Sequence, residues 1–268
     1  MIPSAPLLNA AAFAQTLHWM VVPLAVWCTL ASLELLAVRG AFRPGGVLGS
    51  DLTGLVRGRM NPAILGPRAF AGLAALRLAA GLALPVAGGA SAALLLVILA
   101  ATVLLGIASG GGDGADKIAL VACLAALLIA LGLWLGDRRL CLAGLVWAAG
   151  QVTIAYVASG AAKLARDFWR DGSALAAAMT SYRSGNRLAA AIVRHRAAAL
   201  PLAWGVMLVE TLFPIALVAP QPVCLAILGM LAAFHVATAL VMGLNTYPWA
   251  FAATYPCIMA ANAIIVGS

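Results

Sequence analysis

Five ionisable side chains lie within or at the ends of long apolar stretches of this sequence. A charge in the middle of a bilayer costs several kcal/mol, so such residues usually pair with one another or line a hydrated cavity. An ionisable residue inside a membrane span is therefore a candidate for function. The five candidates are Glu34, Arg77, Lys163, Glu210 and His235.

Lys163 is one of only two lysines, and it ends an apolar run that includes Tyr156. A lysine at a membrane edge most often extends its ammonium group to the lipid headgroups. In the alternative interpretation, Lys163 packs beside Gly160, Ala161 and Ala162, away from water. Desolvation favours the neutral amine, which can act as a general base. The residues alone favour the first interpretation and leave the second open.

Two interpretations also stand for Arg77 and Glu210. They could form an ion pair between two helices with a purely structural role, or they could belong to a site that carries out chemistry. Glu34 lies near the end of its apolar stretch, and we interpret its position as structural.

His235 lies in the middle of an apolar stretch, where a hydrogen-bonded core histidine is commoner than a metal ligand. His18, His195 and His235 lack the spacing of a metal site, so no metal is expected. The cysteines include no CxxC pair, and we expect them to be small buried residues. They are Cys28, Cys123, Cys141, Cys224 and Cys257.

The composition places these residues in a membrane protein. Hydrophobic residues make up 65% of the 268 positions and charged residues only 9%, against about 25% charged residues in a soluble domain. The apolar stretches show little alternation of polar and apolar positions, which favours helices over a barrel. The net charge of +8 does not indicate nucleic-acid binding, because the arginines lie between apolar stretches, where they set topology.

The predicted fold is an all-α, polytopic bundle of about eight transmembrane helices. Each predicted span has roughly the 20 residues that a bilayer requires. The spans are expected at about residues 17–38, 69–86, 90–107, 118–135, 140–164, 202–218, 223–244 and 250–266.

With eight spans, thirteen of the sixteen Lys and Arg residues fall on one side of the membrane. The positive-inside rule then places both chain termini on the side opposite the cytoplasm.

Three connecting segments carry further predictions. Residues 51–65, within a polar loop, are expected to lie on the membrane surface. Asp113 and Asp116, in a glycine-rich hinge, are expected to cap the helix that follows. Residues 165–200 are expected to form an interfacial helical segment that contains a short capped helix beginning near Asp171.

The stretch around Lys163 resembles the signature of HTTM proteins, a family named for the horizontally transferred transmembrane domain and related to vitamin K-dependent gamma-carboxylase. Its matching residues are Tyr156, Gly160, Lys163, Leu164, Asp167, Trp169, Asp171 and Gly172. Four other segments resemble family motifs in the same order. They are Leu76-Arg77-Leu78 with Gly81, then Gly111-Gly112-Asp113, then Glu210 through Pro214, and His235 with Met242-Gly243-Leu244 and Pro248-Trp249.

The resemblance covers about residues 68–262. It implies an HTTM-like transmembrane domain at 68–268, preceded at 1–67 by an additional helix and an amphipathic loop. In gamma-carboxylases the matching lysine is taken as the base tied to oxidation of a reduced quinone, after which carbon dioxide is added to a glutamate side chain, a lyase-type reaction. The resemblance thus implies catalytic roles for Lys163, His235, Glu210 and Arg77, and cofactor-binding roles for Tyr156, Trp169 and Asp113.

The Gly111-Gly112-Asp113 opening is nearer to short bacterial members of the family. One such subfamily matures a secreted peptide, in the sporulation-delaying protein system, alongside a partner protein. The resemblance therefore implies a multi-pass protein of the bacterial inner membrane that modifies or matures a peptide, with a menaquinone- or vitamin K-type cofactor and a second protein encoded nearby.

A second hypothesis stands beside this one. The chain could be a non-enzymatic membrane partner for peptide export, assembly or immunity. A transporter is a weaker third possibility, because inverted repeats and paired broken helices are not evident in the sequence.

Overall fold

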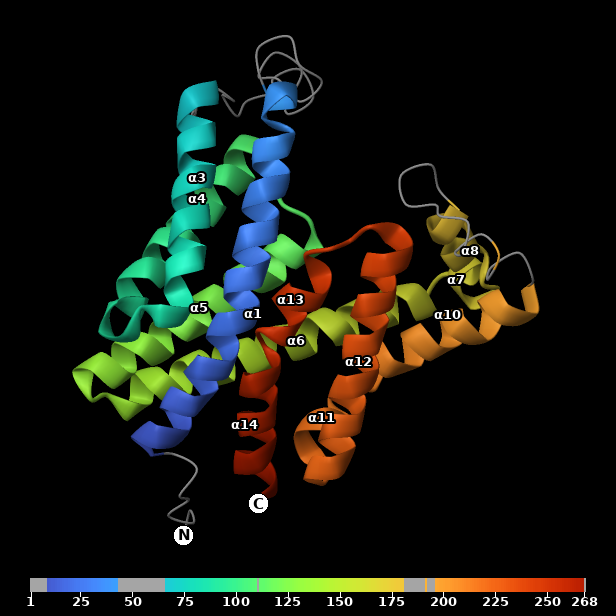
Figure 1. The fold of residues 1–268 in the computed structure, drawn as a ribbon. Helices are drawn as coiled ribbons and strands as arrows, with labels where there is room; N and C mark the ends of the chain where they lie inside the picture. Colours follow the sequence, from blue (N-terminus) through green and yellow to red (C-terminus); the bar gives the residue numbers. More distant parts are fainter. Residues whose placement is uncertain (1–8, 43–65, 110, 181–190, 192–195, 268) are drawn as a thin grey trace. The chain divides into compact units, whose positions relative to one another are not determined.

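The computed structural model describes residues 9–42, 66–109, 111–180, 191 and 196–267. Across these residues the regular secondary structure is helical throughout, without strands (Figure 1). The helices are α1 (Ala10–Ala37), η2 (Arg39–Phe42), α3 (Pro67–Ala83), η4 (Leu84–Val86), η5 (Gly88–Ala90), α4 (Ser91–Ser109), α5 (Gly114–Leu135), α6 (Arg138–Leu164), α7 (Asp167–Arg170), α8 (Ser173–Thr180), α10 (Arg196–Thr211), α11 (Ile215–Val218), α12 (Gln221–Met242), α13 (Tyr247–Ala252) and α14 (Tyr255–Val266).

Seven helical segments of the described residues are long and apolar enough to cross a membrane. They are α1, α3 with η4, η5 with α4, α5, α6, α12, and α13 with α14. Many of their large apolar side chains are exposed, such as Trp134 at 75% and Leu240 at 74%. Surfaces of this kind require lipid as solvent. The protein is therefore a multi-pass membrane protein built as an all-α helical bundle, and the prediction from composition is confirmed.

The predicted sixth span, residues 202–218, is two helices instead of one. Pro214 has no backbone N–H and cannot continue the hydrogen-bond ladder of α10. The amides on either side of it bond to carbonyls three residues back, Phe213 to Glu210 and Ile215 to Leu212. The predicted membrane orientation of the chain termini assumed that residues 202–218 cross the membrane once. That orientation stays a prediction.

Asn262 of α14 holds the end of α11. Its Nδ2 donates to three carbonyl oxygens, at 3.1 Å to Ala216, 3.2 Å to Leu217 and 2.7 Å to Ala219. These carbonyls lie at a helix end, where intrahelical donors are lacking. The carboxyl end of the short helix α11 is thus capped by a buried side chain from another helix.

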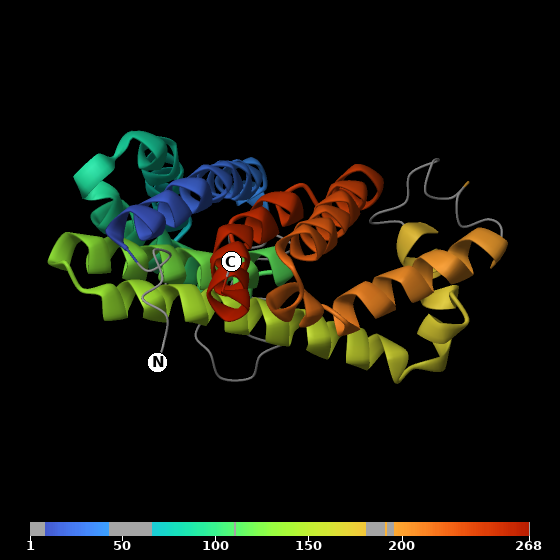
Figure 2. The same ribbon diagram turned by 90° about the horizontal axis from the view of Figure 1, so that it is seen from below.

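The chain forms two compact units, which are described separately. The first comprises Asn9–Gly144. In it α1 packs against α3 and α5, and α4 also contacts both α3 and α5 (Figures 1 and 2). The predicted boundary after residue 67 remains a prediction. Within this unit, however, the first helix packs directly on the helices that follow that boundary.

The second unit comprises Leu145–Ser268 and includes most of α6. Here α12 contacts α11, α13 and α14, while α10 lies beside α7 and α8 (Figure 2). Gly172 brings α8 close to α10. It has φ +82°, and a Cβ there would lie 3.2 Å from the backbone of Leu200. Met179 of α8 and Ala199 of α10 form a small buried cluster.

The predicted helix caps are confirmed. Asp113 and Asp116 form a reciprocal capping box at the start of α5, in which each side chain accepts from the other residue's N–H. Asp171 accepts the N–H of Ser173, the first residue of α8.

The surface segment predicted at 51–65 and most of residues 181–195 lie outside the described residues. The five cysteines are buried, as predicted.

The α5–α6 contact supports a stability prediction. A Cβ at Gly144 would lie 2.6 Å from the Ala125 carbonyl oxygen, so Gly144→Ala must push the two helices apart. We expect a loss of about 1–3 kcal/mol in the free energy of unfolding, typical of overpacking. The measurement is unfolding in mixed detergent micelles followed by circular dichroism. Gly72→Ala is the matched control, because a Cβ there meets nothing within 4 Å. Equal stability of the two variants would contradict the predicted close contact.

Candidate functional site

One face of α6 presents the residues of the signature around Lys163. Tyr156, Ser159, Gly160 and Lys163 recur at spacings of three and four residues, which places them on the same side of a helix. Tyr156 and Gly160 are buried, and Ser159 and Lys163 are half-buried. The apolar residues between them face elsewhere, so α6 directs its polar groups into one region of the second unit.

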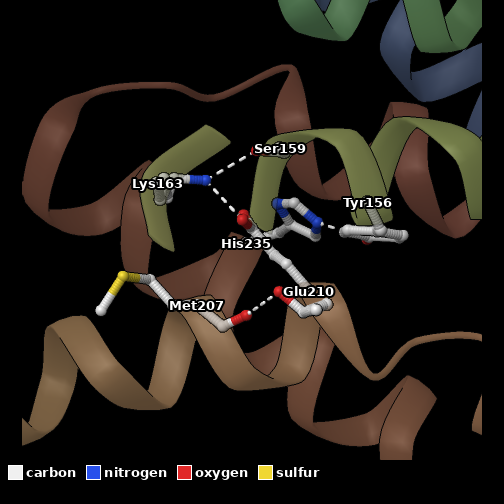
Figure 3. Close-up of polar contacts among 7 residues, drawn as sticks. Tyr156, Ser159, Lys163, Met207, Glu210 and His235 are labelled. Atoms are coloured by element: carbon white, nitrogen blue, oxygen red, sulfur yellow. Dashed lines mark hydrogen bonds and ion pairs between the residues drawn. The ribbon is translucent and has the colours of Figure 1, made fainter. Parts of the chain in front are cut away.

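The amine of Lys163 is held by several groups (Figure 3). Its Nζ donates to Ser159 Oγ at 2.7 Å and to Glu210 Oε2 at 2.5 Å. It also lies 5.3 Å from the centre of the Trp169 ring, within the range of a cation–π contact. The Lys163 side chain is only 17% exposed and that of Glu210 only 7%. The interpretation of Lys163 as a lysine that simply extends to the headgroups is therefore wrong.

Gly160 makes this ion pair possible. A Cβ at position 160 would lie 2.7 Å from the backbone nitrogen of Thr211 and 3.1 Å from the carbonyl carbon of Glu210. Only a residue without a side chain lets the end of α10 approach α6 so closely. Because Glu210 precedes Thr211, this approach brings its carboxylate within reach of Lys163, one turn further along α6.

The position of Glu210 explains why it needs a cation. It lies in the last turn of α10, where the partial negative charge of the helix end disfavours a carboxylate. The hydroxyl of the next residue, Thr211, donates to the Met207 carbonyl oxygen at 2.7 Å, so this hydroxyl is already used as a donor. Lys163 thus supplies the charge that a buried acid requires.

A second polar pair lies in the same unit. The Tyr156 hydroxyl and His235 Nε2 are 2.8 Å apart, and His235 is 3% exposed. The imidazole stacks on Phe251 with ring centres 3.9 Å apart and planes inclined by 16°. Its Nδ1 has no hydrogen-bond partner in the described part of the chain. His235 is therefore a hydrogen-bonded core residue that retains one unused buried nitrogen.

The two pairs form a single cluster. Glu210 lies close enough to Tyr156 for an electrostatic interaction, and so does Tyr255. Figure 3 shows Lys163, Glu210, Tyr156 and His235 gathered between α6, α10 and α12. These four residues and Trp169 are five of the predicted site residues, and the structure brings them together within one compact unit. A proton can pass between Lys163 and Glu210 along their hydrogen bond, and the cluster has the groups needed for acid–base chemistry.

The other two predicted site residues lie in the first unit. Arg77 Nε donates to Ser32 Oγ at 2.9 Å, and Asp113 is the N-cap of α5. Arg77 and Glu210 each have a hydrogen-bond partner within their own unit, and the interpretation of these two as an ion pair with each other stays a prediction. Glu34 is exposed near the end of α1, consistent with a positional role.

Three residues of the cluster were not identified from the sequence. Ser159 lies four residues before Lys163, and helical spacing could have revealed it. Tyr255 and the stacking ring of Phe251 belong to a segment far along the chain, and no local pattern links them to Lys163.

The described residues contain no group of three or more His, Cys, Asp or Glu that could hold a metal ion. The absence of a metal stays a prediction.

Comparison with protein-family models, with curated proteins and with solved structures gives no match. The HTTM family assignment therefore remains a prediction that rests on the motifs of the sequence. The function has to be argued from the cluster itself.

The ion pair can be tested by a double-mutant cycle. Removing either partner leaves a desolvated charge, and we expect Lys163→Met and Glu210→Gln each to cost roughly 2–3 kcal/mol of unfolding free energy, somewhat less than for a fully buried pair. The double variant should cost less than the sum by about 1 kcal/mol or more. Additive effects in denaturant unfolding would mean that the two side chains do not interact.

Proposed function

We propose that this protein is a membrane-embedded enzyme in which Lys163 acts as a general base. The observation that carries the proposal is the buried Lys163–Glu210 pair, 2.5 Å apart and beside the Tyr156–His235 pair. A structural ion pair between helices needs no such neighbours. A cluster of acid, amine, phenol and imidazole in an apolar bundle is the kind of arrangement that enzymes use to move protons.

The pair itself can generate the base. Transfer of one proton from the Lys163 ammonium to the Glu210 carboxylate gives a neutral amine and a neutral acid. The transfer leaves no separated charges in the apolar surroundings, where such charges are costly. The amine can then take a proton from a substrate while Glu210 keeps the first one, so no unpaired charge has to enter the membrane.

The Tyr156–His235 pair supports a second role. The hydroxyl of Tyr156 and Nε2 of His235 share one proton, and the unpartnered Nδ1 of His235 provides a further donor or acceptor position. We assign to this pair the orientation of a bound group, and to Lys163 the removal of its proton. Trp169, whose ring lies 5.3 Å from the Lys163 amine, covers the amine on one side.

We extend the proposal to a reduced quinone as the bound group. Its two hydroxyl groups need one base and one hydrogen-bond partner, and Lys163 and the unused Nδ1 of His235 match these needs. When bound, a quinone of the menaquinone or vitamin K type would supply two electrons for an oxidation. Lys163 would accept a hydroxyl proton at Nζ, and Nδ1 of His235 would form a hydrogen bond to the quinone.

The resemblance to HTTM proteins supports a peptide as the substrate. We propose that the chain is a short bacterial HTTM-like protein of the inner membrane that modifies or matures a peptide, alongside a second protein encoded nearby. The support is the order of five sequence motifs, together with the meeting of three of them, around Lys163, Glu210 and His235, in one unit.

Substitution of the two lysines tests the proposal. We expect Lys163→Ala to abolish the modified peptide in host cells that lack the native gene and carry the variant, as measured by mass spectrometry of membrane and secreted peptides. In nanodiscs, the same variant should lower oxygen-dependent oxidation of reduced menaquinone to the background rate. Lys117→Ala is the matched control, because Lys117 is the other lysine and is exposed.

The controls separate loss of chemistry from loss of structure. Membrane insertion and the helical circular dichroism signal of Lys163→Ala should match the wild type, and Lys117→Ala should retain full activity. Full peptide product in Lys163→Ala would contradict the enzyme proposal and favour a non-enzymatic partner. That alternative predicts loss of function on alteration of the exposed residues near α7, such as Phe168, which is 50% exposed.

A further inference from the structure

A second buried charge lies in the first unit, in a setting unlike that of Lys163. The guanidinium carbon of Arg77 lies 5.3 Å from the centre of the Trp27 ring, in a cation–π contact between α3 and α1. Arg77 is 2% exposed and Trp27 is fully buried. The helices are tightly joined there, since Cys28 Sγ donates to the Arg77 carbonyl oxygen at 3.1 Å.

The charge of Arg77 is poorly compensated. A guanidinium stays protonated in proteins, so burial cannot neutralise it. Within the described residues, neither of the two ion pairs includes Arg77. The carboxylate that interacts with it electrostatically is Asp116, which forms no ion pair with Arg77 among the described residues. The hydrogen bond to Ser32 engages only Nε.

Two buried donors of this contact are unused. Neither Nη2 of Arg77 nor Nε1 of Trp27 has a hydrogen-bond partner in the described part of the chain. Leaving a buried donor unsatisfied costs about 1–3 kcal/mol, and more for a charged group. Two such donors on one arginine–tryptophan contact indicate an acceptor that binds there, and the surplus positive charge indicates that this acceptor is negative.

We propose that Arg77 and Trp27 form a binding site for one small anion inside the first unit. The anion accepts from Arg77 Nη2 and Trp27 Nε1, and Ser32 holds the guanidinium in place. The shared chemistry is a compact negative acceptor, either a free halide or the carboxylate group of a small organic acid. No bond forms or breaks at this site.

The position within the span excludes a lipid phosphate as the ligand. Arg77 is ten residues after Pro67, about 15 Å along the axis of α3 at 1.5 Å per residue. A bilayer core is about 30 Å thick, so the guanidinium lies near mid-depth, out of reach of headgroups. Only an anion small enough to enter the bundle can pair with it there.

The test follows the indole N–H of Trp27 by NMR. The protein is labelled with 15N in its tryptophan rings and placed in nanodiscs, and the Trp27 signal is identified by its absence in Trp27→Phe. Chloride, formate and acetate are titrated separately at constant ionic strength, with a bulky sulfonate as the balancing anion. We expect the Trp27 signal to move saturably, whereas that of Trp134, which is 75% exposed, does not.

Two variants make the result specific. In Arg77→Gln the apparent dissociation constant should rise at least about tenfold, as expected for loss of a charge-assisted hydrogen bond. Trp27→Phe keeps the ring under the guanidinium but removes the donor. The anion should therefore raise its unfolding temperature less than it raises that of the wild type. The unfolding temperature of Trp27→Phe still tests the proposal if Arg77→Gln does not fold. Neither the NMR titration nor the unfolding temperature depends on an enzymatic activity.

The response pattern identifies the source of the anion. Saturation with chloride alone supports an inorganic anion, whereas saturation with formate or acetate alone supports a carboxylate ligand. Saturation with both supports a site for either. If none of the three anions moves the Trp27 signal saturably, the donors are met by water and the proposal is overturned.

Discussion

The ion pair between Lys163 and Glu210 is the interaction on which the candidate site depends. Glu210 lies at the carboxyl end of α10, where the helix dipole and the apolar surroundings both disfavour a negative charge. Lys163 lies on a helix of a membrane bundle, where an isolated ammonium would be equally costly. Each charge offsets the cost of burying the other, and their 2.5 Å contact joins the carboxylate directly to the amine. A carboxylate hydrogen-bonded to an amine in apolar surroundings is the arrangement that the proposed proton transfer requires.

One helix and one glycine fix this geometry. The spacing of Tyr156, Ser159 and Lys163 on α6 directs all three polar groups to one side, and Gly160 between them admits the end of α10. The same face therefore positions the pair with Glu210 and the pair with His235. The aromatic rings of Phe251 and Trp169 then cover the imidazole and the amine. The site is built from elements that also hold the second unit together, so its precision follows from packing and not from a flexible loop.

The sequence identified the class of the fold and most of the cluster, because charges are rare in this chain and each one inside an apolar stretch carries information. It also identified the caps of α5, because a capping box is a local pattern. It could not choose the partner of Glu210, since that choice depends on which helices pack together. Pro214 was visible in the sequence, but the capping of α11 by Asn262 depends on how α14 packs and has no local signal. The unused donors of Arg77 and Trp27 likewise become visible only when two helices are brought together.

The most direct test of the site is the NMR signal of the Lys163 amine itself. The chain has only two lysines, so labelling the lysine ζ-nitrogens with 15N gives two signals, and Lys163→Met assigns them. If Glu210 holds the amine, Glu210→Gln must move the Lys163 signal and protect its hydrogens less from exchange with solvent, while the Lys117 signal stays unchanged. A Lys163 signal that is the same in the wild type and in Glu210→Gln would contradict the ion pair and, with it, the proposed base.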